Sequence, residues 1–421
     1  MQRQARVSGP RRLESGRSTD KGISRAVLAL AAFFRLASLG APALWGDEVL
    51  AAGAQYLPLG ELLDELHNRE SVRAPIDPPA YHLANRWFHA AIPDPAEAIF
   101  TPRGRFFLRL LSALAGVGLV GLVFLLARRL ASPNGAWVPA LLVAFSFYGI
   151  YYSQENRPYA AVAVVAALSA WLLLQIAATR DWRLAPAYGL SLALLGYLHY
   201  VAAMVIVVHV LALAAMMAIG RKKVDRGVYL IAGLGLSLAA LLLAPWLFET
   251  LLIALKPQLF QPHIPAEGGT AIAGWRMLLA AGAHFGCGMW GSLIVFVPLA
   301  ALGWLTTWRK NRLAALLFAA HYAVPTLYLA ATGFGQFFHP RYLIFVYPIH
   351  QLLAGLGVIA VAKWSTRRLD FLRRRPWIAT ALLLLLLLAL NAAALGEYYR
   401  YGIKCSTDAP AFADFCNTYI H

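Results

Sequence analysis

Two adjacent carboxylic acids, Asp47 and Glu48, follow the first long apolar stretch of the chain. Keeping two charged carboxylates at the edge of a hydrocarbon layer is costly unless water, a cation or a substrate lies beside them. A carboxylate within hydrogen-bond reach of a hydroxyl group can accept its proton as a general base. We therefore predict that Asp47 is a catalytic base and that Glu48 supports it or holds a metal ion.

A second group of candidate residues forms the run Tyr151-Tyr152-Ser153-Gln154-Glu155-Asn156-Arg157-Pro158-Tyr159. This run combines aromatic, acidic and basic side chains, and Pro158 stands where it can open the following helix. Glu155 is a further candidate catalytic acid, which either orients an acceptor or balances an arginine. The simpler alternative is an ordinary loop whose aromatic side chains form an interfacial belt.

Arginines close to these acids are suited to binding phosphate, because the guanidinium fork makes two bonds and stays charged in a partly dry site. The main candidates are Arg341 and Arg157, followed by Arg109 and Arg35. An arginine at a membrane boundary can instead reach the lipid headgroups. His199 can bind a hydroxyl group or a divalent cation, or it can be a buried residue bonded to a carbonyl group.

The composition of the chain indicates the class of protein and the kind of structural element that position these residues. Of 421 residues, 60% are hydrophobic and only 14% are charged, which is too apolar for a soluble protein. Crossing a bilayer takes about 20 apolar residues in a helix. We predict an all-α polytopic membrane protein with about 11 transmembrane helices, near residues 22–42, 106–127, 136–153, 158–178, 184–200, 201–219, 227–248, 275–306, 313–332, 342–362 and 376–396.

The net charge of +17 could suggest a nucleic-acid-binding protein, but the distribution of the charges argues against it. Most Lys and Arg residues fall in the N-terminal segment and in every second loop, whereas most acids fall in the other loops. This asymmetry is typical of the positive-inside rule. We predict no nucleic-acid partner, a place in the cell inner or plasma membrane, a cytoplasmic N-terminus and an outward C-terminus.

The polar segments divide the chain further. Residues 1–21 are basic and are predicted to be a disordered cytoplasmic segment, and residues 22–396 form the predicted transmembrane domain. Within it, residues 43–105 are a long outer loop in which apolar residues recur at helical spacing, so we predict interfacial amphipathic helices there. Residues 397–421 form a short outward tail, whose two cysteines are either bridged or separate thiols.

Several short motifs occur in order along the chain and share one predicted side of the membrane. They are Asp47-Glu48, Pro78-Pro79-Ala80-Tyr81, Arg109-Leu110-Leu111-Ser112-Ala113-Leu114, the run from Tyr151 to Tyr159, Leu198-His199-Tyr200, and His339-Pro340-Arg341-Tyr342. From about residue 26 to about residue 365, this arrangement resembles the polytopic glycosyltransferases of the GT-C fold. The branch it resembles is related to protein O-mannosyltransferases and the lipid A aminoarabinose transferase. Asp77 departs from that pattern, because many relatives carry a histidine before the proline pair.

The resemblance implies a GT-C-like helical bundle that transfers a sugar, with inversion, from a polyprenyl-phosphate-linked donor. The acceptor would be a hydroxyl group of a lipid, glycan or protein on the extracytoplasmic face. Asp47 would be the general base, with Glu48 and Glu155 as the other catalytic residues. The donor phosphate would be bound by Arg341, Arg157 and Arg109, and the substrates by Asp77, Tyr81, Tyr159, His199 and Tyr342. No cofactor is required by the resemblance, although a divalent metal ion is compatible with it.

A transporter or flippase of lipid-linked sugars is the main alternative. Such proteins usually have ionisable residues near the bilayer midplane, broken helices and two related halves. Here most charged residues lie in the loops and at the ends of the spans, and no repeat is visible at half-length. Arg35 is the exception, because it can lie deep in the first span. A membrane scaffold without catalysis would leave the outward acids and arginines without a purpose.

Overall fold

The computed structural model describes residues 11–67, 78–131, 135–219, 225–255, 274–287, 290–332, 340–375 and 377–401. Over these ranges the regular secondary structure is entirely helical, which confirms the all-α prediction. The helices, with short 3-10 turns labelled η, are α1 (Arg11–Leu36), α2 (Gly46–Tyr56), α3 (Leu59–His67), α4 (Pro79–His89), α5 (Pro95–Phe100), α6 (Pro102–Leu130), α7 (Trp137–Phe145), α8 (Phe147–Ser153), α9 (Tyr159–Thr179), α10 (Leu184–Leu198), η2 (Tyr200–Ala203), α11 (Met204–Ile219), α12 (Arg226–Leu255), α13 (Gly274–Gly286), η4 (Trp290–Ser292), α14 (Leu293–Lys310), α15 (Arg312–Thr332), η6 (Pro340–Leu343), α16 (Tyr347–Arg368), α17 (Asp370–Arg374) and α18 (Trp377–Tyr401).

Long apolar helices make up the body of the molecule. Every predicted span contains at least one helix, although the number that crosses the bilayer stays a prediction. Within the described part of the chain, five stretches are long and apolar enough to cross a membrane: Pro102–Leu130, Tyr159–Thr179, Tyr200–Ile219, Arg226–Trp246 and Trp377–Gly396.

One predicted span, residues 136–153, is interrupted. α7 ends at Phe145, Ser146 has an extended backbone conformation, and α8 begins at Phe147. Ser146 caps the second helix, because its side-chain oxygen accepts a hydrogen bond from the amide of Gly149 at 3.3 Å. The apolar run in the sequence conceals this interruption, since Ser146 is a single small polar residue within it.

Buried polar side chains bond the backbone groups that lie at this interruption. The guanidinium group of Arg35 donates to the carbonyl oxygens of Ala144 at 3.1 Å and Val143 at 3.0 Å. Asn391 of α18 accepts a hydrogen bond from the amide of Phe147 at 2.9 Å. Because backbone groups without partners are costly in hydrocarbon, we assign Arg35 to the support of the fold and not to phosphate binding.

Two glycines allow α14 and α16 to pack closely. A side-chain carbon added at Gly303 would meet the carbonyl oxygen of Leu353, and one added at Gly357 would meet that of Leu299. Small residues at such crossings let helix backbones approach, and this packing supports helix association inside a membrane. The same two glycines look unremarkable in the sequence, where they are surrounded by other apolar residues.

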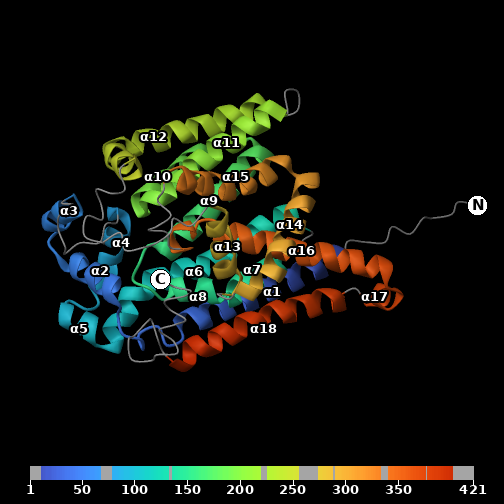
Figure 1. Cartoon of the computed structure of the whole chain (residues 1–421), viewed down its shortest axis with the longest axis horizontal. Coiled ribbons are helices and arrows are strands. Elements are labelled where there is room, and N and C mark those ends of the chain that lie inside the picture. The colour runs from blue at the N-terminus through green and yellow to red at the C-terminus, as the bar shows by residue number, and fades with distance from the viewer. Residues whose placement is uncertain are drawn as a thin grey trace, which may run out of the picture.

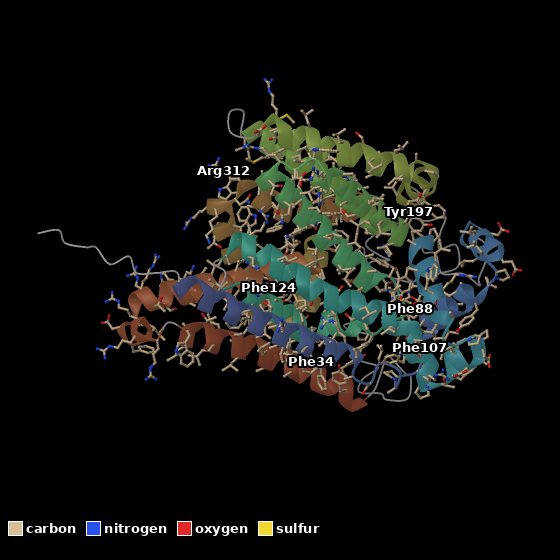
Figure 2. The ribbon with its side chains drawn as sticks, turned by 180° about the vertical axis from the view of Figure 1, so that it is seen from behind. Phe34, Phe88, Phe107, Phe124, Tyr197 and Arg312 are labelled. Atoms are coloured by element: carbon tan, nitrogen blue, oxygen red, sulfur yellow. The ribbon has the colours of Figure 1, made fainter. Side chains whose placement is uncertain are left out.

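The short helices α2, α3, α4 and α5 gather at one end of the bundle, and α17 lies at the other end (Figure 1). Figure 2 shows Arg312, from a predicted cytoplasmic loop, toward the opposite end from Phe88 and Phe107. α2 packs against α4 and α5, and α4 packs against α6 and α10. The predicted outer loop is therefore helical and docked on the bundle, and its place at the membrane surface stays a prediction.

Candidate active site

Asp47 and Arg341, which are far apart in the sequence, come together beside the first turn of α2. Asp47 lies in that turn, and Arg341 lies in η6. The Nη2 atom of Arg341 is 3.5 Å from the Oδ2 atom of Asp47. The Arg341 side chain is 12% exposed and that of Asp47 is 35% exposed. The carboxylate is thus reachable from outside the protein, while the guanidinium group is mostly covered.

Aromatic rings cover Arg341. Its guanidinium carbon lies 5.3 Å from the ring centre of Trp45, 5.8 Å from that of Tyr159 and 5.7 Å from that of Tyr342. The faces of such rings attract a cation. Burial by itself lowers the pKa of Arg341, but the nearby tyrosines and the Asp47 carboxylate raise it, and the net shift is upward. Arg341 therefore stays charged although it is covered.

Arg157 is a second cation at the same place. Its guanidinium carbon lies 5.7 Å from the ring centre of Tyr159, so Arg157 and Arg341 share this ring. The ring of His199 lies 5.9 Å from that of Tyr159 and 5.7 Å from that of Tyr342, because the turns η2 and η6 pack together. Two cations held near one another in a mostly buried place favour the binding of an anion.

Glu48, directly after Asp47, is completely buried and bonded to Arg109. It accepts two hydrogen bonds from the guanidinium group of Arg109, at 2.9 and 2.7 Å, and a third from the amide of Asn156 at 2.7 Å. The remaining N–H groups of Arg109 donate to the carbonyl oxygens of Leu39, Pro42 and Ala43. All five N–H groups of this guanidinium are therefore used within the protein, and none remains for a phosphate.

This geometry makes Glu48 and Arg109 partners of each other, and their predicted catalytic and phosphate-binding roles stay predictions. The ion pair between Glu48 and Arg109 connects the start of α2 to α6 and to the segment after α1. It therefore fixes the helical turn that carries Asp47, although the Glu48 and Asp47 side chains have different neighbours. Adjacent residues in an α-helix point about 100° apart. Two neighbouring carboxylates can thus have separate environments, which their adjacency in the sequence does not reveal.

Asn156 is the centre of a buried polar network that we did not predict. Its side-chain oxygen accepts hydrogen bonds from Asn85 at 2.8 Å and from Gln55 at 3.2 Å. The hydroxyl group of Tyr81 lies 2.8 Å from that of Ser112 and donates to Asn156 at 3.4 Å. Tyr81 is completely buried in this network, and its predicted contact with a substrate stays a prediction.

Gln154 and Glu155 lie in the turn after α8. The side-chain amide of Gln154 donates to the carbonyl oxygens at the end of α1, those of Phe34, Arg35 and Ala37. These carbonyl groups have no partner within the helix, so Gln154 is a cap for α1. Glu155 is only 1% exposed, and its predicted catalytic role stays a prediction.

Comparisons with known proteins agree with this architecture. Residues 96–248 match the family model described as dolichyl-phosphate-mannose-protein mannosyltransferase. The structure of ArnT from Cupriavidus metallidurans bound to undecaprenyl phosphate is 16% identical, with a TM-score of 0.55 over 89% of this chain and 72% of ArnT. Archaeal oligosaccharyltransferase AglB from Archaeoglobus fulgidus, in complex with an inhibitory peptide and a dolichol-phosphate, is 12% identical, with a TM-score of 0.59 over 91% of this chain and 56% of AglB. The chain has the GT-C fold. No curated protein matched the sequence.

The matched part of the GT-C fold does not contain the whole candidate site. It includes Arg109, Arg157 and His199, whereas Asp47 and Arg341 lie outside residues 96–248. Asp47 and Arg341 reach residues 96–248 because α2 and η6 pack against this matched part. The contact of Arg341 with Tyr159 is an example. The GT-C bundle thus assembles one site from segments spread over most of the chain.

Two parts of the predicted site fall outside the described residues of this GT-C chain. Asp77 lies in residues 68–77, and His339 of the late motif lies in residues 333–339. Among the residues that the structure describes, no group of three or more His, Cys, Asp or Glu side chains could hold a metal ion. The divalent metal ion therefore stays a prediction.

Sequence reasoning missed the residues that support the site. A weak signal for them exists, because Gln55 and Asn85 are uncharged amide residues on short helices, and Tyr81 and Asn85 have the spacing of one helix face. The aromatic cover offers a further signal, since Trp45 directly precedes the acidic pair.

Proposed function

We propose that this chain is a membrane glycosyltransferase that moves a sugar from a polyprenyl-phosphate-linked donor to an acceptor hydroxyl group on the extracytoplasmic face, with inversion. The observation that carries the proposal is the 3.5 Å approach of Arg341 to Asp47. A reachable base and a covered cation are the groups that this reaction needs side by side. The compared structures support the donor class, since the ArnT structure holds undecaprenyl phosphate and the AglB structure a dolichol-phosphate.

In the proposed reaction, the acceptor oxygen attacks the anomeric carbon of the sugar while Asp47 takes the hydroxyl proton. The bond between the anomeric carbon and the phosphate oxygen breaks, and the lipid phosphate leaves with the bonding electrons. Attack from the face opposite the phosphate inverts the configuration at this carbon. The departing phosphate gains negative charge, which Arg341 and Arg157 stabilise through charge-assisted hydrogen bonds.

The other predicted site residues fit around this core with different roles. We assign Glu48 and Arg109 to positioning, because their buried ion pair fixes the start of α2. Tyr159 and Tyr342 hold Arg341 in place through their ring faces. His199, whose ring lies beside both tyrosines, is the candidate to contact a sugar hydroxyl group.

The transport alternative gains no support from the interrupted helix at Ser146. Transporters use unwound helix backbone to bind substrates or ions. Here Arg35 and Asn391 bond the backbone groups at the interruption. The interruption therefore serves packing in the described structure.

The proposal is tested by reconstituting the protein in vesicles with a panel of polyprenyl-phosphate-linked hexoses and pentoses and measuring sugar transfer. Asp47→Asn should fold like the natural protein and lower the transfer rate by about a hundredfold or more, because the amide cannot accept the proton. Asp64→Asn, which changes an exposed acid on the neighbouring helix α3, is the matched control and should keep full activity. Undiminished transfer by the Asp47→Asn protein would remove Asp47 from this role, and no transfer from any donor would overturn the proposal.

A further inference from the structure

Trp45 lies at the candidate site but has no role in the proposed reaction so far. It occupies the N-cap position of α2, where its side chain makes no capping hydrogen bond. Its ring covers the guanidinium group of Arg341 at 5.3 Å. The ring face accounts for the cover of Arg341 without the indole N–H group, so this N–H group needs a separate explanation.

Two buried N–H groups at this place lack an acceptor among the described residues. They are the indole N–H of Trp45 and the Nε–H of Arg341. An indole nitrogen can only donate a hydrogen bond, and a buried donor without an acceptor is costly. Two such donors belong to side chains that contact each other, and the guanidinium of Arg157 lies at the same Tyr159 ring as that of Arg341, which points to a ligand with several negatively charged oxygens.

The contact between Asp47 and Arg341 is loose. Their closest atoms are 3.5 Å apart, longer than a well-formed charge-assisted hydrogen bond. The Asp47 carboxylate is also partly exposed, so water can replace its contact with Arg341 at little cost. A stronger anion can therefore take this position on the guanidinium group.

We propose that Trp45 is a phosphate-binding residue of the donor site, and that the donor phosphate and Asp47 compete for Arg341. The inference rests on the proposed function. The phosphate oxygens accept hydrogen bonds from the indole N–H of Trp45 and from Arg341, and Asp47 is released from Arg341 as the phosphate binds. A carboxylate freed from a guanidinium group is a better proton acceptor, so donor binding activates the base.

The same arrangement favours the bond-breaking step. The phosphate of the sugar donor is a diester, and when the sugar leaves, it becomes a monoester that carries about −1.5 to −2 charges at neutral pH. The hydrogen bonds from Trp45 and Arg341 strengthen as this charge develops, which stabilises the transition state more than the bound donor. The free lipid phosphate should accordingly bind more tightly than the sugar-linked donor.

The experiment measures the affinity of the full-length protein in lipid nanodiscs for polyprenyl phosphate without a sugar. Trp45→Phe keeps an aromatic ring over Arg341 but removes the five-membered ring with its N–H group, so the Kd should rise about tenfold or more. Trp87→Phe is the matched control, because Trp87 is 84% exposed on α4 at the same end of the molecule, and it should leave the Kd unchanged. Asp47→Asn should lower the Kd several-fold, because it removes the competing carboxylate.

The outcomes separate this inference from the proposed function, because binding of the lipid phosphate requires no sugar transfer. An unchanged Kd for Trp45→Phe would overturn the role of Trp45, and an unchanged or raised Kd for Asp47→Asn would overturn the competition. The second variant does not alter Trp45, so it remains decisive if Trp45→Phe folds poorly.

Inorganic phosphate should compete only at far higher concentrations; equal competition would overturn the assignment to the lipid-linked donor. If both variants behave as expected while no donor supports transfer, the phosphate site holds and the glycosyltransferase proposal fails.

Discussion

Two neighbouring acids have different surroundings at the scale of single residues. Asp47 is partly exposed and faces Arg341, whereas Glu48 is completely buried and bonded to Arg109 and to the Asn156 amide. A buried carboxylate with three good donors keeps its charge and its position. Glu48 thus resembles a structural anchor, and Asp47 is left as the acid that can meet a substrate.

The Glu48–Arg109 pair should show strong coupling when its partners are replaced. Arg109→Met alone should lower the free energy of unfolding by about 3–5 kcal/mol, because it leaves the buried Glu48 carboxylate without its cation. Combining it with Glu48→Met removes both charges and should restore part of this loss. Denaturation of the purified proteins in detergent provides the measurement. Losses that simply add in the double variant would contradict the predicted coupling.

The interrupted helix is the main feature at the scale of elements. α7 and α8 are separated by one extended residue, and α8 leads into the turn that holds Glu155 and Arg157. The interruption is maintained by Arg35 from α1 and Asn391 from α18, so three elements far apart in sequence determine its geometry. An ionisable residue inside a membrane usually indicates function, but Arg35 supports the backbone.

Arg35→Met should therefore lower the stability of the protein while leaving donor binding by the folded protein unchanged. The change leaves the carbonyl groups of Val143 and Ala144 without their donor, at a cost of about 1–3 kcal/mol for each buried group. Arg25→Met, an exposed arginine on the same helix, is the matched control and should leave the melting temperature unchanged. Thermal unfolding measures the stability of both variants, and donor titration of the folded fraction measures their donor binding. A large rise in donor KM at unchanged stability would instead indicate phosphate binding by Arg35.

The separation of the two ends is the main feature at the scale of the whole molecule. α2, α3, α4 and α5 cluster at one end, and α17, which is flanked by basic residues, lies at the other (Figure 1). This arrangement agrees with the sidedness expected from the basic loops. A site beside α2 is then on the side that the positive-inside rule assigns to the exterior.

Cysteine labelling can test this orientation. In a background in which all three native cysteines are replaced, Arg103→Cys and Arg373→Cys introduce thiols at side chains that are 67% and 73% exposed. In right-side-out vesicles, a membrane-impermeant maleimide should label only the Arg103→Cys protein, and both proteins after detergent treatment. Labelling of both in intact vesicles, or of Arg373→Cys alone, would contradict the predicted topology.

The sequence by itself determined the class of this protein and the types of residue at its site. Long apolar stretches are local properties, so an all-α membrane bundle followed directly from hydropathy, and the structure confirms it. The acidic pair, the aromatic-rich turn and the late arginine were also recognisable, because each is a short run of residue types that is costly near hydrocarbon. These local features led to Asp47 and Arg341, whose side chains do meet.

Only the tertiary structure decided which of these residues face one another. In the folded protein Glu48 pairs with Arg109, Tyr81 lies in a buried polar network, Arg35 bonds the backbone at the interrupted helix, and the Trp45 ring lies over Arg341. The physical reason is that such contacts join segments distant in sequence, and their geometry depends on how helices cross and on where a helix is broken. Hydropathy and spacing describe one segment at a time, so the division between substrate-facing and supporting side chains emerges only after the helices pack.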